Sequence, residues 1–347
     1  MTDRTSCGPT ARPRGVTTTT GLAVGTLLPA FDGMDLATRR AVVADLEAGG
    51  VDHVAVGDHV SFRDGLGFDG LLQAGHLLAL SDVLPVHVGV YLLALRHPVP
   101  VARQLADLAS LAPGRLVLGV GVGGEDRHEY EVCGVDPATR GARTDEALAL
   151  LRRLMTGKPI TSTGRFFPVQ DAQVRPAVPD MPVIIGGRSS HALQRTAAYG
   201  DGWLGIWVSP TRYAAAVARV AELAAAAGRN MPAWRHGLQV WCGFGATREA
   251  AVAPLAAAMQ DMYKTPFAAF EKTCPAGTPE DVADFLAPYL EAGATSVNLI
   301  PRSTDLATSI AGVAEVRRLL HARHAPSPAA PATGVTPGPS RPGQDKP

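Results

Sequence analysis

The sequence predicts a closed barrel of eight parallel β/α units, a (β/α)8 TIM barrel, with an insertion between strands 7 and 8. The stretches "LEAGGVDHVAV" (Leu46–Val56) and "LEAGATSVNLI" (Leu290–Ile300) share one pattern: a helix end, a glycine stop and a short apolar strand. Other stretches repeat this pattern, and about eight such units in roughly 300 residues are typical of this barrel.

A helix that returns to a strand through a tight turn, unit after unit, makes parallel strands with right-handed crossovers. The expected strands are Leu22–Leu28, His53–Gly57, Val86–Leu93, Arg115–Val122, Val183–Gly186, Gly202–Val208, Gly237–Phe244 and Ser296–Ile300. The segment 247–278 holds an extra helical stretch, which we expect near the mouth of the barrel.

Capping residues mark several helix boundaries. Gly50 and Gly293 are expected in the left-handed conformation that closes a helix. Thr144 is expected to cap a helix that stops at 157, and Thr278 to cap another, with Pro279 at its first position. The expected apolar faces are Val101, Leu105 and Leu108 in one helix and Val282, Phe285, Leu286, Tyr289 and Leu290 in another.

Composition narrows the class of protein. Lys plus Arg and Asp plus Glu each total 32 of the 347 residues, without a basic stripe, so a nucleic-acid partner is not expected. The four scattered cysteines predict neither a metal site nor disulfides and favour a reducing cytoplasm. The sequence contains no run of 18 apolar residues, so no membrane span is predicted. We expect residues 21–322 to form the barrel, and residues 1–20 and the Pro-rich residues 323–347 to be disordered.

The loops after the strands should carry the function, because in a barrel the site lies at the carboxyl ends of the strands. Asp58 and His59 come after strand 2. Histidine handles protons near neutral pH, and a neighbouring carboxylate can fix its tautomer. The alternative is a solvent-facing pair of loop residues. His53, His76 and His87 lie within elements, where we expect packing or surface roles.

Two glycine-containing loops are further candidates for ligand binding. The glycines of 119–124, including Gly123, would let a planar ligand approach the backbone, and Glu125 comes directly after them. They do not match the dinucleotide fingerprint, because no helix opens directly at the glycines. After strand 5, the turn from Gly186 through Gly187 and Arg188 to Ser189 opens a helix, which predicts a phosphate seat. The alternative is an ordinary turn with a serine cap.

Several long blocks together resemble the luciferase-like monooxygenase superfamily, and most closely its actinobacterial branch that uses the deazaflavin coenzyme F420. They are "GVDHVAVGDHV", "LLALRHPVPVARQLADLASLAPGRLVLGVGVGG", "GVDPATRGARTDEALALLRRLMTG", "MPVIIGGRSSHALQRTAAYGDGW" and "GTPEDVADFLAPYLEAGATSVNLI". They cover roughly residues 21–320 in the right order, which makes the resemblance specific. The family fold, a TIM barrel with an insertion, agrees with the count of units.

The resemblance implies a role for the pair after strand 2 and for strand 3. In F420-using relatives the histidine of the Asp-His pair lies by the reactive ring, and that position is His59 here, with Asp58 beside it. Relatives carry a non-prolyl cis peptide at the end of strand 3 that backs the ring. In this chain it falls at Gly89–Val90.

The resemblance also implies a cofactor-binding role for Gly123 and for the turn from Gly186 to Ser189, which would hold the phosphate. Some relatives carry a proton-donating glutamate directly after the strand-4 glycines. Gly124 fills that place here, and Glu125, one residue later, is the candidate acid.

The function this implies is an F420-dependent oxidoreductase that transfers a hydride between the deazaflavin and a small organic substrate. One alternative is an FMN-dependent monooxygenase that uses oxygen and reduced flavin from a partner reductase. A second alternative is a non-catalytic ligand-binding barrel. A cytoplasmic homodimer and a cofactor-reducing partner enzyme are expected by resemblance.

Overall fold

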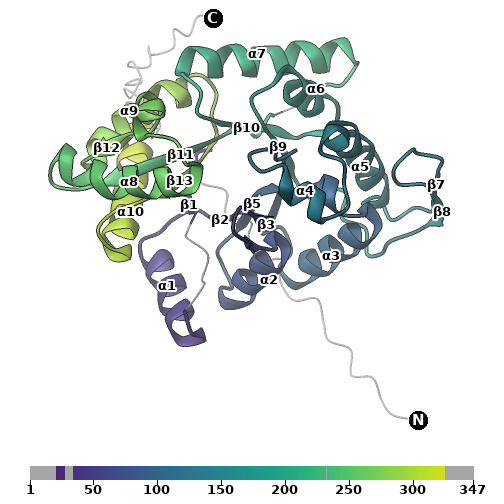
Figure 1. The fold of residues 1–347 in the computed structure, drawn as a ribbon, viewed down its shortest axis with the longest axis horizontal. Helices are drawn as coiled ribbons and strands as arrows, with labels where there is room; N and C mark the ends of the chain where they lie inside the picture. The colour runs from purple at the N-terminus through teal and green to yellow at the C-terminus, as the bar shows by residue number, and fades with distance from the viewer. Residues whose placement is uncertain (1–20, 28–33, 232, 325–347) are drawn as a thin grey trace, which may run out of the picture.

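The predicted barrel is confirmed by a computed structural model, which describes residues 21–27, 34–231 and 233–324 (Figure 1). Eight parallel strands close into a ring because β10 pairs with both β9 and β11. In ring order they are β1 (Ala23–Leu27), β2 (Val54–Val56), β5 (Val86–Tyr91), β6 (Leu116–Val120), β9 (Val183–Gly186), β10 (Gly202–Ile206), β11 (Gly237–Phe244) and β13 (Ser296–Pro301). The strand β1 lies between β2 and β13, so the two stretches of similar sequence feed strands on either side of it.

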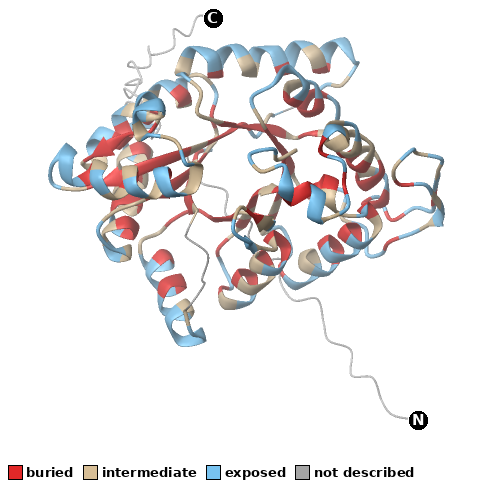
Figure 2. Ribbon diagram, in the orientation of Figure 1, coloured by how far each residue is buried: buried red, intermediate tan, exposed pale blue. Residues whose placement is uncertain are grey.

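Helices surround the ring with their apolar faces turned inward, as Figure 2 shows by the buried strands and the exposed outer helix faces. They are α1 (Leu36–Ala48), α2 (Gly70–Leu80), α3 (Pro98–Leu111), α5 (Arg140–Leu154), α6 (Ser190–Tyr199), α7 (Pro210–Ala226), α9 (Pro279–Glu291) and α10 (Leu306–His324). In α3, Val101 and Leu105 are buried and Leu108 is partly buried, which confirms the predicted face. In α9, Val282, Leu286 and Tyr289 are buried, while Phe285 and Leu290 pack against the core.

Four of the five predicted helix boundaries are confirmed. Gly50 and Gly293 adopt φ angles of 68° and 97°, the left-handed region that a glycine occupies at little cost. Thr278 caps α9 in a capping box: its hydroxyl accepts from the Asp281 N–H, and the Asp281 carboxylate accepts from the Thr278 N–H. Pro279 occupies the first helical position.

The prediction that Thr144 caps a helix is wrong. The helix α5 already begins at Arg140, and Thr144 is buried inside it, where its hydroxyl donates to the Arg140 carbonyl. The start is set upstream, because Asp136 caps a short 3-10 turn, η2 (Pro137–Thr139), that runs directly into α5. The far end agrees with the prediction, since Gly157 closes the turn after α5 with a φ of 73°.

The predicted insertion between strands 7 and 8 is confirmed. It contains α8 (Arg248–Tyr263), two 3-10 turns, η3 (Phe267–Ala269) and η4 (Glu271–Thr273), and a short strand, β12 (Ala276–Gly277), that pairs with β11. The barrel closes without it, because β11 pairs directly with β13.

Several short elements were not predicted from the sequence. An antiparallel hairpin of β3 (His59–Phe62) and β4 (Leu66–Phe68) comes after β2, and the short helix α4 (His128–Val132) comes after β6. A second hairpin, β7 (Ile160–Ser162) and β8 (Val169–Ala172), projects beside α5 (Figure 1). A 3-10 turn, η1 (Leu93–Leu95), comes after β5.

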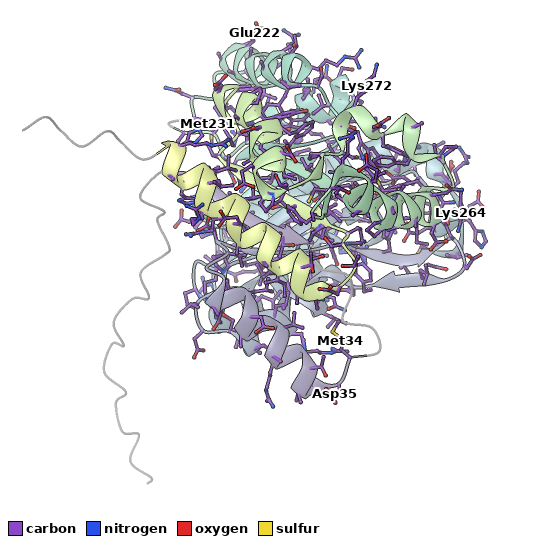
Figure 3. The ribbon with its side chains drawn as sticks, turned by 90° about the vertical axis from the view of Figure 1, so that its left-hand side faces the viewer. Met34, Asp35, Glu222, Met231, Lys264 and Lys272 are labelled. Atoms are coloured by element: carbon purple, nitrogen blue, oxygen red, sulfur yellow. The ribbon has the colours of Figure 1, made fainter. Side chains whose placement is uncertain are left out.

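The helix α10 lies across the barrel between α1 and α9 (Figure 3). It is tied to the strands by the buried Asp52, whose carboxylate accepts from Arg317 at 2.9 Å and from the Val24 N–H. The helix continues to His324, two residues past the predicted end of the domain at 322. The tails predicted to be disordered, 1–20 and 325–347, lie outside the described residues. Among the residues that the structure describes, no helix has the length and apolar character needed to cross a membrane.

We expect Thr278→Ala to lower the free energy of unfolding by about 1 kcal/mol, because it removes the hydroxyl of the capping box. Thr211→Ala is the matched control: Thr211 lies in the first turn of α7, is exposed and makes no side-chain hydrogen bond within the described ranges. Urea unfolding followed by tryptophan fluorescence measures both. Equal stability of the two variants would contradict the role of the cap.

Candidate active site

Loops at the carboxyl ends of the strands surround a cavity of about 740 Å³. The residues predicted from the sequence as site residues all line it. They are Asp58, His59, Gly89, Val90, Gly123, Glu125, Gly186, Gly187, Arg188 and Ser189. Parallel strands present their carboxyl ends at one end of a barrel, so segments far apart in the chain meet at this mouth.

His59 is held by a carboxylate that the sequence did not single out. Its Nδ1 lies 3.1 Å from the Glu129 carboxylate, and that carboxylate also accepts from the Val60 N–H at 2.7 Å. Because an ionised carboxylate only accepts, Nδ1 carries the ring proton and Nε2 is left for a ligand in the cavity. The His59 side chain is 22% exposed and that of Glu129 is 3% exposed, so the pair is fixed from the protein side.

The Glu129 carboxyl is ionised by its hydrogen bonds rather than by contact with water. Burial acts to raise the pKa of Glu129, but the hydrogen bonds from His59 and from the Val60 and Ser61 N–H groups outweigh it. The pKa of Glu129 therefore lies below its ordinary value. A carboxylate in this state stabilises a positive charge on the imidazole when that ring takes up a proton.

Asp58 does not orient His59, which corrects the expectation that the neighbouring carboxylate fixes the ring. The two adjacent side chains have different partners: His59 contacts Glu129, and Asp58 does not contact His59. The buried Asp58 accepts instead from the Arg96 guanidinium at 2.7 and 2.8 Å and from the N–H groups of Gly70 and Leu92. Asp58 thereby fastens the end of β2 to the end of β5 and to the start of α2.

The floor of the cavity is built around Val90. The Gly89–Val90 peptide bond is cis, as predicted, and the pairing of β5 with β6 shifts register there. Two glycines make room for the Val90 side chain. A β-carbon at Gly186 would lie 2.7 Å from Val90 Cγ1, and one at Gly121 would overlap its Cγ2. Val90, Gly121 and Gly186 all line the cavity, so this part of its lining is apolar and carries only one side chain, against which a flat ring can lie.

The turn after β9 has the features of a phosphate seat. Gly187 adopts a φ of 127°, and the Ser189 side chain caps α6 by accepting from the Ala192 N–H. The exposed Arg188 lies 5.2 Å above the Trp207 ring and has no carboxylate partner among the described residues. A helix start and an unpaired guanidinium side by side favour an anion.

Glu125 and Gly123 line the cavity in the loop after β6, the strand that pairs with β9. Gly123 has a φ of 58° and packs against Leu92 and Tyr130. Glu125 is exposed and makes no ion pair in the part of the chain that the structure describes. The position before it, Gly124, has a φ of 121° and lies near the Arg140 guanidinium, so the rim has no bulky side chain there.

Three aromatic rings, Trp207, Trp241 and Tyr263, line the side of the cavity toward the insertion. A fourth ring, Phe270, packs against Trp207 and Tyr263, and we call the four together the aromatic wall. Trp207 meets Tyr263 edge to face at 4.9 Å, and Trp241 meets the same ring at 5.7 Å. Trp207 holds a φ of 48°, a region rare for bulky residues and more frequent at functional sites. Its position directly after β10 was the signal that the sequence offered.

Four residues that line the cavity carry a buried polar atom without a hydrogen-bond partner in the described structure. These atoms are Gln239 Oε1, Trp207 Nε1, Trp241 Nε1 and Arg140 Nε. Gln239 adjoins the floor, since a β-carbon at Gly89 would lie 3.2 Å from its Oε1. A buried acceptor without a donor is costly, so a ligand with an N–H group at this place would be favoured.

The other histidines were expected to have packing or surface roles. His53 and His87 are inside the barrel, where their rings stack at 3.8 Å and His53 Nε2 lies 2.5 Å from Asn298 Oδ1. Burial lowers the pKa of both, so they are neutral packing residues. His76 does not line the cavity.

The sequence profile described as luciferase-like monooxygenase matches residues 13–296, so the chain belongs to this family. An uncharacterized protein of Mycobacterium tuberculosis is 34% identical over 173 residues, which are 49% of this chain and 59% of that protein. An F420-dependent glucose-6-phosphate dehydrogenase of Beutenbergia cavernae is 34% identical over 167 residues, 46% of this chain and 49% of that protein. The chain thus spans less than two thirds of the length of either relative.

Solved structures share the fold. An F420-dependent secondary alcohol dehydrogenase in complex with an F420-acetone adduct superposes with a TM-score of 0.76 at 20% identity, over 86% of this chain and 99% of that one. The oxygenating constituent of 3,6-diketocamphane monooxygenase from Pseudomonas putida, in complex with FMN, gives a TM-score of 0.65 at 14% identity, over 85% and 96%. One barrel therefore serves both kinds of cofactor in other proteins.

We expect Glu129→Gln to destabilise the protein by about 1–3 kcal/mol at pH 7, because charge-assisted hydrogen bonds are lost. The pKa of Glu129 is lower in the folded than in the unfolded state. Its stabilisation is therefore complete above the unfolded pKa of about 4.3 and is lost as the pH falls through the folded value. Urea unfolding between pH 7 and about 3.5 measures this.

The difference in free energy of unfolding between wild type and Glu129→Gln should shrink as the pH falls below about 4. Glu131→Gln on the same helix is the matched control. That side chain is 55% exposed, and its ion pair with His128 at 3.7 Å is a surface pair that contributes little, so this variant should stay close to wild type in free energy of unfolding at every pH. If the difference in free energy of unfolding for Glu129→Gln stays constant with pH, the lowered pKa of Glu129 in the folded protein is contradicted.

Proposed function

We propose that the protein is an F420-dependent oxidoreductase that transfers a hydride between the deazaflavin and a small organic substrate. The observation that carries the proposal is that the residues predicted for ring, phosphate and proton all line one cavity. The relative named as an F420-dependent dehydrogenase supports a deazaflavin in preference to FMN.

The cavity fits such a cofactor in three ways. The apolar lining at Val90, Gly121 and Gly186 suits a planar ring. The unpartnered Gln239 Oε1 beside Gly89 suits the N–H of the ring's pyrimidine edge. The turn from Gly187 to Ser189, with Arg188, suits the phosphate.

Within this proposal the deazaflavin, when bound, supplies the hydride chemistry, and the protein supplies position and proton transfer. His59 Nε2 accepts the proton that leaves the substrate as it is oxidised, or returns it in the reverse direction. Glu129 keeps the proton on Nδ1 and stabilises the imidazolium that forms. Glu125, in the loop after β6, is proposed as a second acid. The homodimer, the cytoplasmic location and the cofactor-reducing partner stay predictions.

The test is a binding titration of purified protein with F420, with its deazaflavin nucleoside that lacks the phosphate, and with oxidised and reduced FMN. We expect F420 to bind more tightly than FMN in both redox states. Arg188→Met should weaken F420 binding about 10-fold or more and leave the nucleoside unaffected, because only the phosphate contact is lost.

Arg212→Met, on the exposed face of α7, is the matched control and should bind F420 like the wild type. Tight binding of reduced FMN with oxygen-dependent turnover would replace the proposal by a monooxygenase. If neither F420 nor FMN binds, the alternative of a non-catalytic ligand-binding barrel is favoured instead.

We expect His59→Ala to lower turnover about 10²- to 10⁴-fold without loss of F420 binding, because the proton acceptor is removed and the floor is not. The loss of the visible absorbance of F420 with a panel of small secondary alcohols measures turnover. His128→Ala is the matched control, since His128 is 65% exposed and does not line the cavity. Unchanged turnover in His59→Ala would remove His59 from the mechanism.

A further inference from the structure

Besides Arg188 and Arg140, a third arginine, Arg302, lines the cavity, and it lies away from the phosphate turn. Arg302 comes directly after β13, and its guanidinium carbon is 4.7 Å from the centre of the Trp241 ring, within the aromatic wall. The residue is anchored by its backbone, because the Arg302 N–H donates to the Cys242 carbonyl at 2.8 Å. The side chain is thereby held over an aromatic face rather than free to follow solvent.

The charge of Arg302 is not compensated by the protein. Its guanidinium donates a hydrogen bond to the neutral Pro301 carbonyl, and within ranges 21–27, 34–231 and 233–324 no carboxylate is paired with it. Glu125 also lines the cavity but forms no ion pair with it. Burial lowers the pKa of Arg302, which means that the cation has lost water without gaining an anion. The arginines that pair with carboxylates, such as Arg96 with Asp58, are different in this respect.

Strand order separates Arg302 from the proposed phosphate seat. Arg188 follows β9 and Arg302 follows β13, and the strands β10 and β11 lie between these two in the ring. Trp207, Tyr263 and Trp241 fill that interval, so an arginine stands at each end of the aromatic wall. A phosphate held at Arg188 therefore does not neutralise Arg302, and a second anion is needed there.

We propose that Arg302 binds a carboxylate on the substrate, and that the remainder of this substrate is apolar and lies along the aromatic wall. The inference rests on the proposed function, since it names the class of substrate for the same cavity. The lining around Arg302 is apolar, with Ile300 and Met262 beside Tyr263 and Trp241. Apolar surroundings strengthen a charge-assisted hydrogen bond and favour an apolar body in the ligand.

Charge balance favours a carboxylate over a phosphate. One guanidinium neutralises one negative charge, and its planar fork matches the two oxygens of a carboxylate. A phosphate monoester carries about 1.5–2 charges at pH 7 and would leave an excess against an apolar wall.

The test compares hexanoate, hexanol and hexyl phosphate as probes, with the full-length protein both free and loaded with F420. Binding is followed by intrinsic tryptophan fluorescence, to which Trp207 and Trp241 in the wall contribute. We expect wild type to bind hexanoate at least about 10-fold more tightly than hexanol. In Arg302→Met the affinities for hexanoate and hexanol should differ by no more than about 2-fold, and Arg302→Lys should keep part of the preference for hexanoate.

Arg212→Met is again the matched control and should keep the full preference, and thermal unfolding of each variant checks that it is folded. Equal binding of hexanoate and hexanol to wild type, or a preference that survives in folded Arg302→Met, would overturn the inference. Tighter binding of hexyl phosphate would overturn the choice of a carboxylate.

The two proposals fail separately in these measurements. If F420 binds and the hexanoate preference is absent, the inference fails and the proposed function stands. If F420 does not bind and Arg302 still selects hexanoate, the cofactor assignment fails and the carboxylate seat stands.

Discussion

The site depends on one buried ion pair, Asp58 with Arg96. The Asp58 carboxylate also accepts from the N–H groups of Gly70 and Leu92, so a single side chain joins β2, β5 and the start of α2. A buried carboxylate that loses one partner is left with an uncompensated charge, which makes the arrangement all-or-none. His59 directly follows Asp58, and Val90 in the cavity floor lies two residues before Leu92, whose N–H donates to Asp58. The distance between His59 and the floor therefore depends on the Asp58–Arg96 pair.

Much of the fold could be predicted because its signals are local. Gly50 and Gly293 close helices wherever the chain returns to a strand, and a repeated β/α unit leaves few topologies. The start of α5 was predicted five residues late, because Asp136 and the turn after it govern that start instead of Thr144. The β3–β4 and β7–β8 hairpins escaped prediction, since strands of three or four residues carry almost no periodicity.

The residues of the site could be predicted better than their partners. His59 and Arg188 are found as the polar residues just past the ends of two strands, because parallel strands put those positions at one end of the barrel. The sequence does not reveal that Glu129, 70 residues away from His59, holds the imidazole. That contact depends on how α4 packs against β3, and an acidic residue in a polar loop looks like a solvated one. The same holds for Tyr263, whose partners come from two other strands.

The insertion between β11 and β13 has an evolutionary consequence. The barrel closes by the direct pairing of these two strands, while Tyr263 and Phe270 are carried on the insertion outside that pairing. Descendants of such a gene can exchange or resculpt this one module and acquire new ligand preferences. The pair of His59 and Glu129, on β3 and α4, lies outside this module, so a change in the module leaves that pair in place.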